Sequence, residues 1–177
     1  LESGSQKVRT SVLRRHYSNE DIINVVKLAK KYGLHVCFYV MVGIPGETLE
    51  DFRETIKFCR ESQPDGIYLA IFFPYNGTEL YKYCEENHLL PDEIDPVLDR
   101  KRAILDLPGF SKKEIQKQND WFYYNVYKGH RPLYTLLGYV LFRKISSNYF
   151  FGNMYGRLRR FKFVEKLANK VKLFVEN

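Results

Sequence analysis

The chain has 177 residues, of which 28 are Lys or Arg, 21 are Asp or Glu, and 45% are hydrophobic. This length suits one domain, or one domain with an appendage, and the aromatic content of 16% excludes disorder as the dominant state. The longest uncharged apolar run, Leu133–Phe142, has about half the length of a membrane span, and no signal peptide opens the chain. We therefore expect a cytoplasmic protein, in the form of a fragment of something longer.

The cysteines argue against a metal or disulfide framework. Cys37, Cys59 and Cys84 are odd in number and form neither a CxxC nor a CxxxCxxC motif. Such spacing is untypical of zinc sites, of self-contained iron–sulfur sites and of disulfide-rich domains. We expect them to be buried small hydrophobes and predict no metal ligands in this chain.

Strand and helix patterns alternate through residues 1–90. Capping boxes begin two helices, because Ser18 and Thr48 are each followed three residues later by Asp. In chain order, the expected elements are a helix between Ser18 and Gly33, the strand His35–Val42, a helix from Thr48 to about Ser62, the strand Ile67–Phe73 and a helix near Leu80–Glu86.

Short connections between such elements predict parallel strands joined by helices, an α/β fold. Each strand has one uniformly apolar face, which suits packing beneath helices. The opposite faces are mixed and predict a lined cavity; they consist of His35, Cys37, Tyr39 and Met41 in one strand, and Tyr68, Ala70 and Phe72 in the other. Because two strands cannot close a barrel, further strands are implied. The predicted fold is a partial (β/α) barrel followed by an α-helical C-terminal extension.

Three segments resemble radical SAM enzymes. Glu2–Gln6, ESGSQ, resembles the turn after the fourth barrel strand; Phe38–Thr48, FYVMVGIPGET, resembles the fifth strand; and Phe72–Tyr81, FFPYNGTELY, resembles the turn after the sixth. The nearest branch is the cobalamin-binding-domain class, similar to anaerobic magnesium-protoporphyrin IX monomethyl ester cyclase. The resemblance implies that residues 1–90 form the C-terminal half of a radical SAM barrel and that residues 91–177 form a helical, basic region.

This resemblance implies an oxidoreductase or cyclase-like enzyme that uses S-adenosylmethionine and a [4Fe–4S] cluster, with cobalamin use left open. The cluster-binding CxxxCxxC would lie upstream, so the fragment alone is expected to be inactive and to hold no catalytic residue. A small, hydrophobic substrate is expected.

The resemblance also implies a set of cofactor-binding residues. Glu2 would accept hydrogen bonds from ribose hydroxyls, and Arg14 would bind the methionine carboxylate, with Arg15 as its competitor. Tyr39 stands where some relatives have a ribose-binding Asp. Met41 and the backbone at Gly43 would lie beside the adenine. For each, an ordinary surface or core role is the alternative. The full set is Glu2, Ser3, Arg14, Tyr39, Met41, Gly43 and Pro74.

The C-terminal region is strongly basic. Residues 101–177 carry 16 basic and 5 acidic side chains, and residues 161–175 form a basic amphipathic pattern. A solvated helix face and an anionic membrane surface or lipophilic anionic substrate are the alternatives, and nucleic acid is not favoured. The competing function is a non-catalytic α/β module whose basic tail binds a membrane surface or a partner. We also expect the fragment to self-associate through an exposed strand edge, unless the tail covers it.

Overall fold

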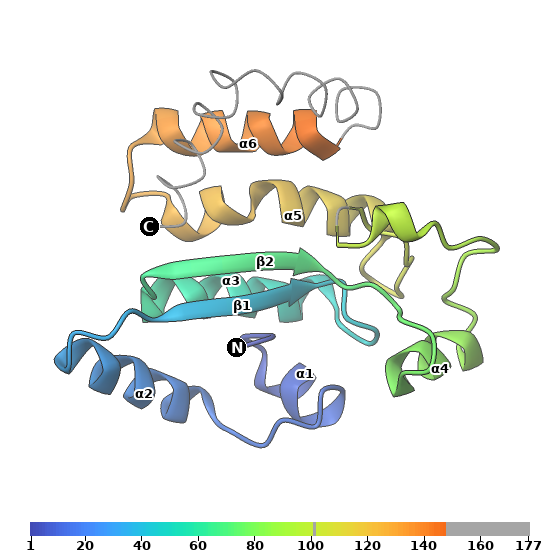
Figure 1. The fold of residues 1–177 in the computed structure, drawn as a ribbon, viewed down its shortest axis with the longest axis horizontal. Coiled ribbons are helices and arrows are strands. Elements are labelled where there is room, and N and C mark those ends of the chain that lie inside the picture. The colour runs from blue at the N-terminus through green and yellow to red at the C-terminus, as the bar shows by residue number, and fades with distance from the viewer. Residues whose placement is uncertain (101, 148–177) are drawn as a thin grey trace. The chain divides into compact units, whose positions relative to one another are not determined.

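The computed structural model describes residues 1–100 and 102–147 (Figure 1). The chain divides into two compact units, with the break between Asn119 and Asp120. The domain boundary expected near residue 90 stays a prediction. Within the described residues, no helix is both long and apolar enough to span a membrane.

The first unit follows the predicted alternation of helices and strands. The helices α1 and α2 precede strand β1, helix α3 connects β1 to β2, and α4 and a single 3-10 turn follow. Their bounds are α1 Gln6–Ser11, α2 Asn19–Lys31, β1 Cys37–Val42, α3 Leu49–Ser62, β2 Gly66–Ile71, α4 Glu79–Glu86 and the 3-10 turn Pro96–Leu98. Helix α5, Lys112–Tyr127, crosses the break between the units.

Both predicted capping boxes are present. The Ser18 hydroxyl accepts from the backbone N–H of Asp21 at 3.1 Å, and the Thr48 hydroxyl accepts from that of Asp51 at 3.2 Å. In return, the two Asp carboxylates accept from the backbone N–H groups of Ser18 and Thr48. The helix starts are therefore determined by local sequence, since each side chain satisfies an otherwise unpaired N–H group.

The two strands are parallel neighbours, with Cys37 opposite Gly66 and Val42 opposite Ile71. Both differ from the predicted ranges at their ends. Val36 lies outside β1, and its N–H donates to the Asp65 carboxylate at 2.7 Å. β2 ends at Ile71 beside the end of β1, where Gly43 turns the partner strand away with a φ of 78°.

Helix α3 covers the apolar face of this sheet, behind both strands in Figure 1. Phe38, Val40 and Val42 of β1 are buried, as are Phe52, Phe58 and Cys59 of α3. The rings of Phe38 and Phe58 stack with centroids 6.3 Å apart. This confirms the prediction that the apolar face of the first strand packs beneath a helix. A closed barrel is not formed by the two strands of the described residues.

The N-terminal segment lies along the outer edge of β1. The Val42 carbonyl accepts from Phe72 N–H at 2.8 Å on the β2 side, and the N–H of the neighbouring Met41 donates to the Glu2 carbonyl at 2.8 Å. Successive residues of a strand direct their backbone groups to opposite edges, so Glu2 lies on the edge away from β2. Self-association through a strand edge stays a prediction.

The chain after α4 returns to the core of the first unit. Ala103, Ile104, Leu105 and Leu107 are buried, and the Phe110 ring lies 6.1 Å from that of Phe52. This part of the chain thus belongs to the core of the first unit as well as connecting α4 to α5.

The second unit begins within α5 and contains α6, Leu133–Ser147. Pro132 directly precedes α6, in keeping with the preference of Pro for helix starts, and the rings of Tyr123 and Tyr139 meet edge to face at 4.8 Å. The basic pattern over residues 161–175 lies outside the described residues, so its membrane or substrate role stays a prediction.

Gly4 is where the N-terminal turn comes closest to α3. A Cβ atom at Gly4 would lie 2.6 Å from the Thr55 Cα and 2.9 Å from the Phe58 Cβ. Since a backbone atom cannot move aside cheaply, we expect Gly4→Ala to lower the free energy of unfolding by about 1–3 kcal/mol in urea denaturation.

The matched control for this substitution is Gly138→Ala in α6, where no atom of the described residues lies within 4 Å of the added Cβ. Its expected effect is neutral or slightly stabilising, because Ala favours helix more than Gly does. Equal stability of Gly4→Ala and the unchanged chain would contradict the close approach.

Candidate functional site

The mixed face of the two strands lines an open hollow of about 470 Å³. This agrees with the cavity predicted for that face, and the volume is in the usual range for small-molecule sites. The lining residues come from the N-terminal turn, both strands and the chain after β2. They are Glu2, Tyr39, Val40, Met41, Tyr68, Leu69, Ala70, Ile71, Phe72, Phe73, Tyr75 and Arg100.

Glu2 supplies the carboxylate of this hollow. The Tyr17 hydroxyl donates to its Oε2 at 2.9 Å, and the Arg15 Nε donates to its Oε1 at 3.3 Å. A carboxylate has about four acceptor positions, and the Glu2 backbone N–H also interacts with this one, so at least one position remains for a ligand. The carboxylate is therefore oriented by the protein and still able to accept further hydrogen bonds.

The charge of Glu2 is favoured by these partners. Partial burial raises the pKa of its carboxyl, but the hydrogen bond from Tyr17 and the nearby positive charges, including Arg15, outweigh burial, and the pKa lies below its ordinary value. Glu2 is thus an ionised acceptor at neutral pH.

Two further residues, Arg9 and Tyr17, support the turn that carries Glu2. No pattern in the sequence pointed to either of them. Arg9 is fully buried; its guanidinium donates to the Ser3 carbonyl at 2.8 Å and to the Tyr17 carbonyl at 3.4 Å. It also lies 5.3 Å from the centroid of the Tyr17 ring and donates to the Asn19 side chain. An Arg within a helix-like sequence carries no signal of burial, so only the folded chain reveals this role.

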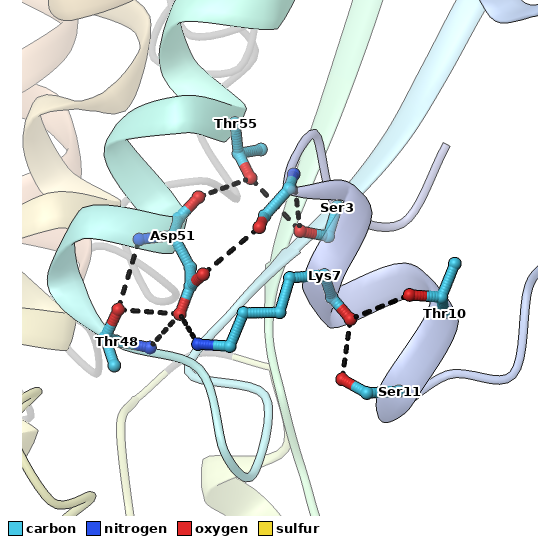
Figure 2. A network of polar contacts seen from close by, with 8 residues as sticks. Ser3, Lys7, Thr10, Ser11, Thr48, Asp51 and Thr55 are labelled. Atoms are coloured by element: carbon cyan, nitrogen blue, oxygen red, sulfur yellow. Dashed lines mark hydrogen bonds and ion pairs between the residues drawn. The ribbon is translucent and has the colours of Figure 1, made fainter. Parts of the chain in front are cut away.

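Ser3 does not line the hollow but anchors the turn that carries Glu2. Its hydroxyl lies 3.2 Å from that of Thr55, which in turn accepts from the Gly4 N–H at 2.9 Å. Figure 2 shows the wider network, in which Asp51 contacts Thr48 and Lys7. The ESGS turn is thereby tied to the first turns of α3.

Of the two competing arginines, only Arg15 contacts Glu2. Arg14 has a φ of 53° and forms an exposed ion pair with Glu79 at 3.0 Å. It does not line the hollow. The spacing left the choice open, because it did not show in which direction the chain turns after α1.

Tyr39 and Met41 line the hollow, as expected of ligand-facing strand positions. Gly43 and Pro74 do not line it; both are buried in the turns that follow β1 and β2. Gly43 packs so closely that an added Cβ would meet the Ile115 side chain at 3.0 Å. Ligand contacts at any of these positions stay predictions.

Glu47 closes the turn between β1 and α3. Its Oε2 accepts from the Gly43 N–H at 2.7 Å and from the Ile44 N–H at 3.3 Å, while its Oε1 is buried without a hydrogen-bond partner among the described residues. Burial raises the pKa of Glu47 to about 8, despite the two backbone hydrogen bonds, and the nearby Asp51 adds to the rise. The α3 cap itself is Thr48, so Glu47 serves the turn and not the helix start.

The side chains that line the hollow are of the kinds that S-adenosylmethionine would need. It combines one ionised acceptor, Glu2, for ribose hydroxyls with apolar and aromatic side chains for a purine ring. Arg15, which forms an ion pair with Glu2, adds a cation that suits the carboxylate of the methionine part.

The chain's own residues do not fit a [4Fe–4S] cluster. The sequence has no CxxxCxxC. Burial raises the pKa of the Cys59 thiol to about 12 and that of Cys84 to about 11, which disfavours the thiolate that iron requires. Among the described residues, no group of His, Cys, Asp and Glu is placed to hold a metal ion.

Tyr17→Phe removes the hydrogen bond that helps to lower the pKa of Glu2 while keeping the ring beside Arg9. We expect the pKa of the Glu2 carboxyl to rise, because burial then acts with less opposition. The measurement is an NMR titration of the Glu2 side-chain carboxyl carbon. Tyr32→Phe, at a 68% exposed position, is the control. An unchanged Glu2 titration in Tyr17→Phe would refute the contact.

Glu47 makes stability depend on pH. Its pKa is about 8 in the folded chain against 4.5 ordinarily, so the folded state holds a proton that the unfolded state releases between these values. The stability contributed by Glu47 is complete below the lower value and is lost as pH rises through the upper one, at roughly 1 kcal/mol per pH unit.

Glu47→Gln, which does not titrate, is expected to flatten this dependence in urea unfolding measured at several pH values. Glu50→Gln, at an exposed position in the first turn of the following helix α3, is the control and should keep the slope. The same slope in Glu47→Gln and the unchanged chain would show that another group is responsible.

Comparison with known proteins agrees with the resemblance. Residues 1–59 match the model of the radical SAM superfamily. An uncharacterized methyltransferase of Pyrococcus horikoshii is 32% identical over 124 residues, which cover 66% of this chain and 25% of that protein. A tRNA-2-methylthio-N(6)-dimethylallyladenosine synthase of Clostridium tetani is 28% identical over 121 residues, 67% of this chain and 25% of that protein. The synthase of the same name from Thermosipho melanesiensis is 31% identical over 129 residues, 71% and 27% of the two chains.

The chain spans about a quarter of the length of these curated relatives. Their names are those of methyl- and methylthio-transferring enzymes, and they lend no support to cyclase chemistry or to cobalamin. Together with the strand–helix–strand arrangement, the family match supports this chain as a portion of a radical SAM enzyme.

Proposed function

We propose that this chain supplies part of the S-adenosylmethionine site of a radical SAM enzyme. In this proposal Glu2 accepts hydrogen bonds from the ribose hydroxyls, and Met41 and the backbone near Gly43 lie beside the adenine. The observation that carries it is the Glu2 carboxylate, ionised and held by Arg15 and Tyr17 beside an open, largely apolar hollow.

Arg15 is the better candidate for the methionine carboxylate. Its Nε already lies at Glu2, and a guanidinium has further donors for a carboxylate, whereas Arg14 is engaged with Glu79. A carboxylate and a cation side by side provide complementary contacts for the sugar and the amino-acid end of one ligand.

When bound, S-adenosylmethionine supplies radical chemistry in this superfamily, and the residues of this chain bind and orient it. The strand-end positions restrict where its ribose and adenine can lie, because β1 and β2 are paired in register over their whole length. Glu47 keeps the turn after β1 closed through Gly43 and Ile44, which holds the backbone that would border the adenine.

The proposed reaction is the transfer of a methyl or methylthio group. The relatives' names favour methyl or methylthio transfer over a cyclase-type oxidation. Membership of the cobalamin-binding class rests on the three strand-end motifs alone.

The test is Glu2→Gln in the full-length protein that carries this chain. A hydrogen bond to a charged group contributes about 1.5–3 kcal/mol, so S-adenosylmethionine affinity should fall by roughly 10-fold or more in equilibrium dialysis. Glu93→Gln, an exposed carboxylate away from the hollow, should bind as the unchanged protein does. Equal affinity of Glu2→Gln and Glu93→Gln would reject the proposed site.

A further inference from the structure

We propose that the same hollow holds a second ligand, a planar conjugated molecule with an anionic group, whose ring lies against Tyr39 and Tyr68 and whose anion meets Arg100. This rests on the proposed function, which gives the Glu2 side to S-adenosylmethionine. Glu2 borders the outer edge of β1, whereas Tyr75 and Arg100 come from the chain after β2.

The two tyrosines form a ready surface for a flat ring. Tyr39 and Tyr68 are register partners on neighbouring strands, and their rings stack with centroids 5.2 Å apart and planes 24° apart. They are 67% and 42% exposed, so much of each ring is open to solvent. An exposed, stacked pair can extend its stack by one more ring, and ring contacts of this kind contribute about 0.5–1.5 kcal/mol beyond area burial.

The rest of the lining favours a conjugated ligand over a sugar. Of the twelve lining residues, five are aromatic and only Glu2 and Arg100 are charged. The rings of Phe73 and Tyr75 lie 5.2 Å apart, next to the end of β2. Apart from Glu2, Arg100 and the tyrosine hydroxyls the lining side chains are apolar, so most of this wall suits ring contact more than hydrogen bonding.

Arg100 supplies the cation. Its Nε donates to the Tyr75 hydroxyl at 3.2 Å, which itself donates to Asp99 at 2.8 Å, and the Arg100–Asp99 pair lies at 3.6 Å. These contacts use Nε, so among residues 1–100 and 102–147 nothing prevents the two terminal nitrogens from making a bidentate contact with a carboxylate, sulfonate or phosphate. The φ of Arg100 is 56°, a left-handed conformation that costs about 1 kcal/mol or more in a non-glycine residue and is typical of binding loops.

The test uses the 177-residue chain and two fluorescent probes of nearly the same shape. 1-Anilinonaphthalene-8-sulfonate has conjugated rings and an anion; N-phenyl-1-naphthylamine has the rings alone. We expect Arg100→Gln to weaken binding of the sulfonate by about 10-fold and to leave the uncharged probe within about 2-fold. Tyr39→Ala should weaken both probes by about 5-fold or more.

Two controls address binding elsewhere on the surface. Lys82→Gln removes an exposed cation and Tyr32→Ala an exposed ring away from the hollow, and neither should change either affinity. Circular dichroism establishes that each variant is folded. If folded Arg100→Gln and Tyr39→Ala bind both probes as the unchanged chain does, the proposal is overturned.

A displacement arm separates two sources of such a ligand. In the Glu2→Gln background, 2-naphthoate and guanosine 5′-monophosphate are each tested for release of the bound sulfonate. Release by one of them supports the proposal and identifies a carboxylated ring or a nucleotide, and release by neither counts against it. Glu2→Gln alone should leave probe binding unchanged, whereas Arg100→Gln should leave S-adenosylmethionine affinity unchanged, so failure of this inference and failure of the proposed function are distinguishable.

Discussion

The contact of the Gly4 backbone with helix α3 is the constraint on which the site depends. It brings the N-terminal turn within van der Waals distance of Thr55, and the hydroxyls of Ser3 and Thr55 and the Asp51 carboxylate then complete the attachment. With the turn held there, the Glu2 carbonyl reaches the Met41 N–H, and its side chain borders the hollow. Because α3 also covers the sheet, the same helix forms the core and positions the candidate ligand group.

The pKa values of two glutamates, Glu2 and Glu47, are shifted in opposite directions. Glu2 is partly exposed and receives donors from charged and phenolic side chains, which favour its ionised form. Glu47 is buried and receives only backbone N–H groups, which do not offset its desolvation. Solvation thus separates a carboxylate suited to binding a ligand from one that closes a turn. Arg9 illustrates the same principle with a cation, since carbonyl groups and the Tyr17 ring take the place of water around it.

The two faces of the β1–β2 pair have different roles, one in the core and one in the candidate site. One face is dry and packs on α3, and the other carries Tyr39, Met41 and Tyr68 into an open hollow. Parallel sheets are ordinarily covered on both faces, so a second face with exposed aromatic rings is a feature that a ligand or further parts of a barrel would explain. The proposed pair of ligands accounts for both the charged ends and the apolar middle of this surface.

The sequence by itself determined the alternation of elements, the two helix caps, the buried face of the first strand and the three turns that point to radical SAM chemistry, because each depends on residues close together in the chain. Three residues named from the resemblance, Glu2, Tyr39 and Met41, line the hollow, and their contact with a ligand stays a prediction. Only the tertiary structure decided that Arg15 and not Arg14 meets Glu2, that Arg9 is buried behind Tyr17, that Ser3 and Pro74 are internal, and that Arg100 reaches the hollow. These depend on the direction of loops and on contacts between residues far apart in the chain, which local periodicity does not encode.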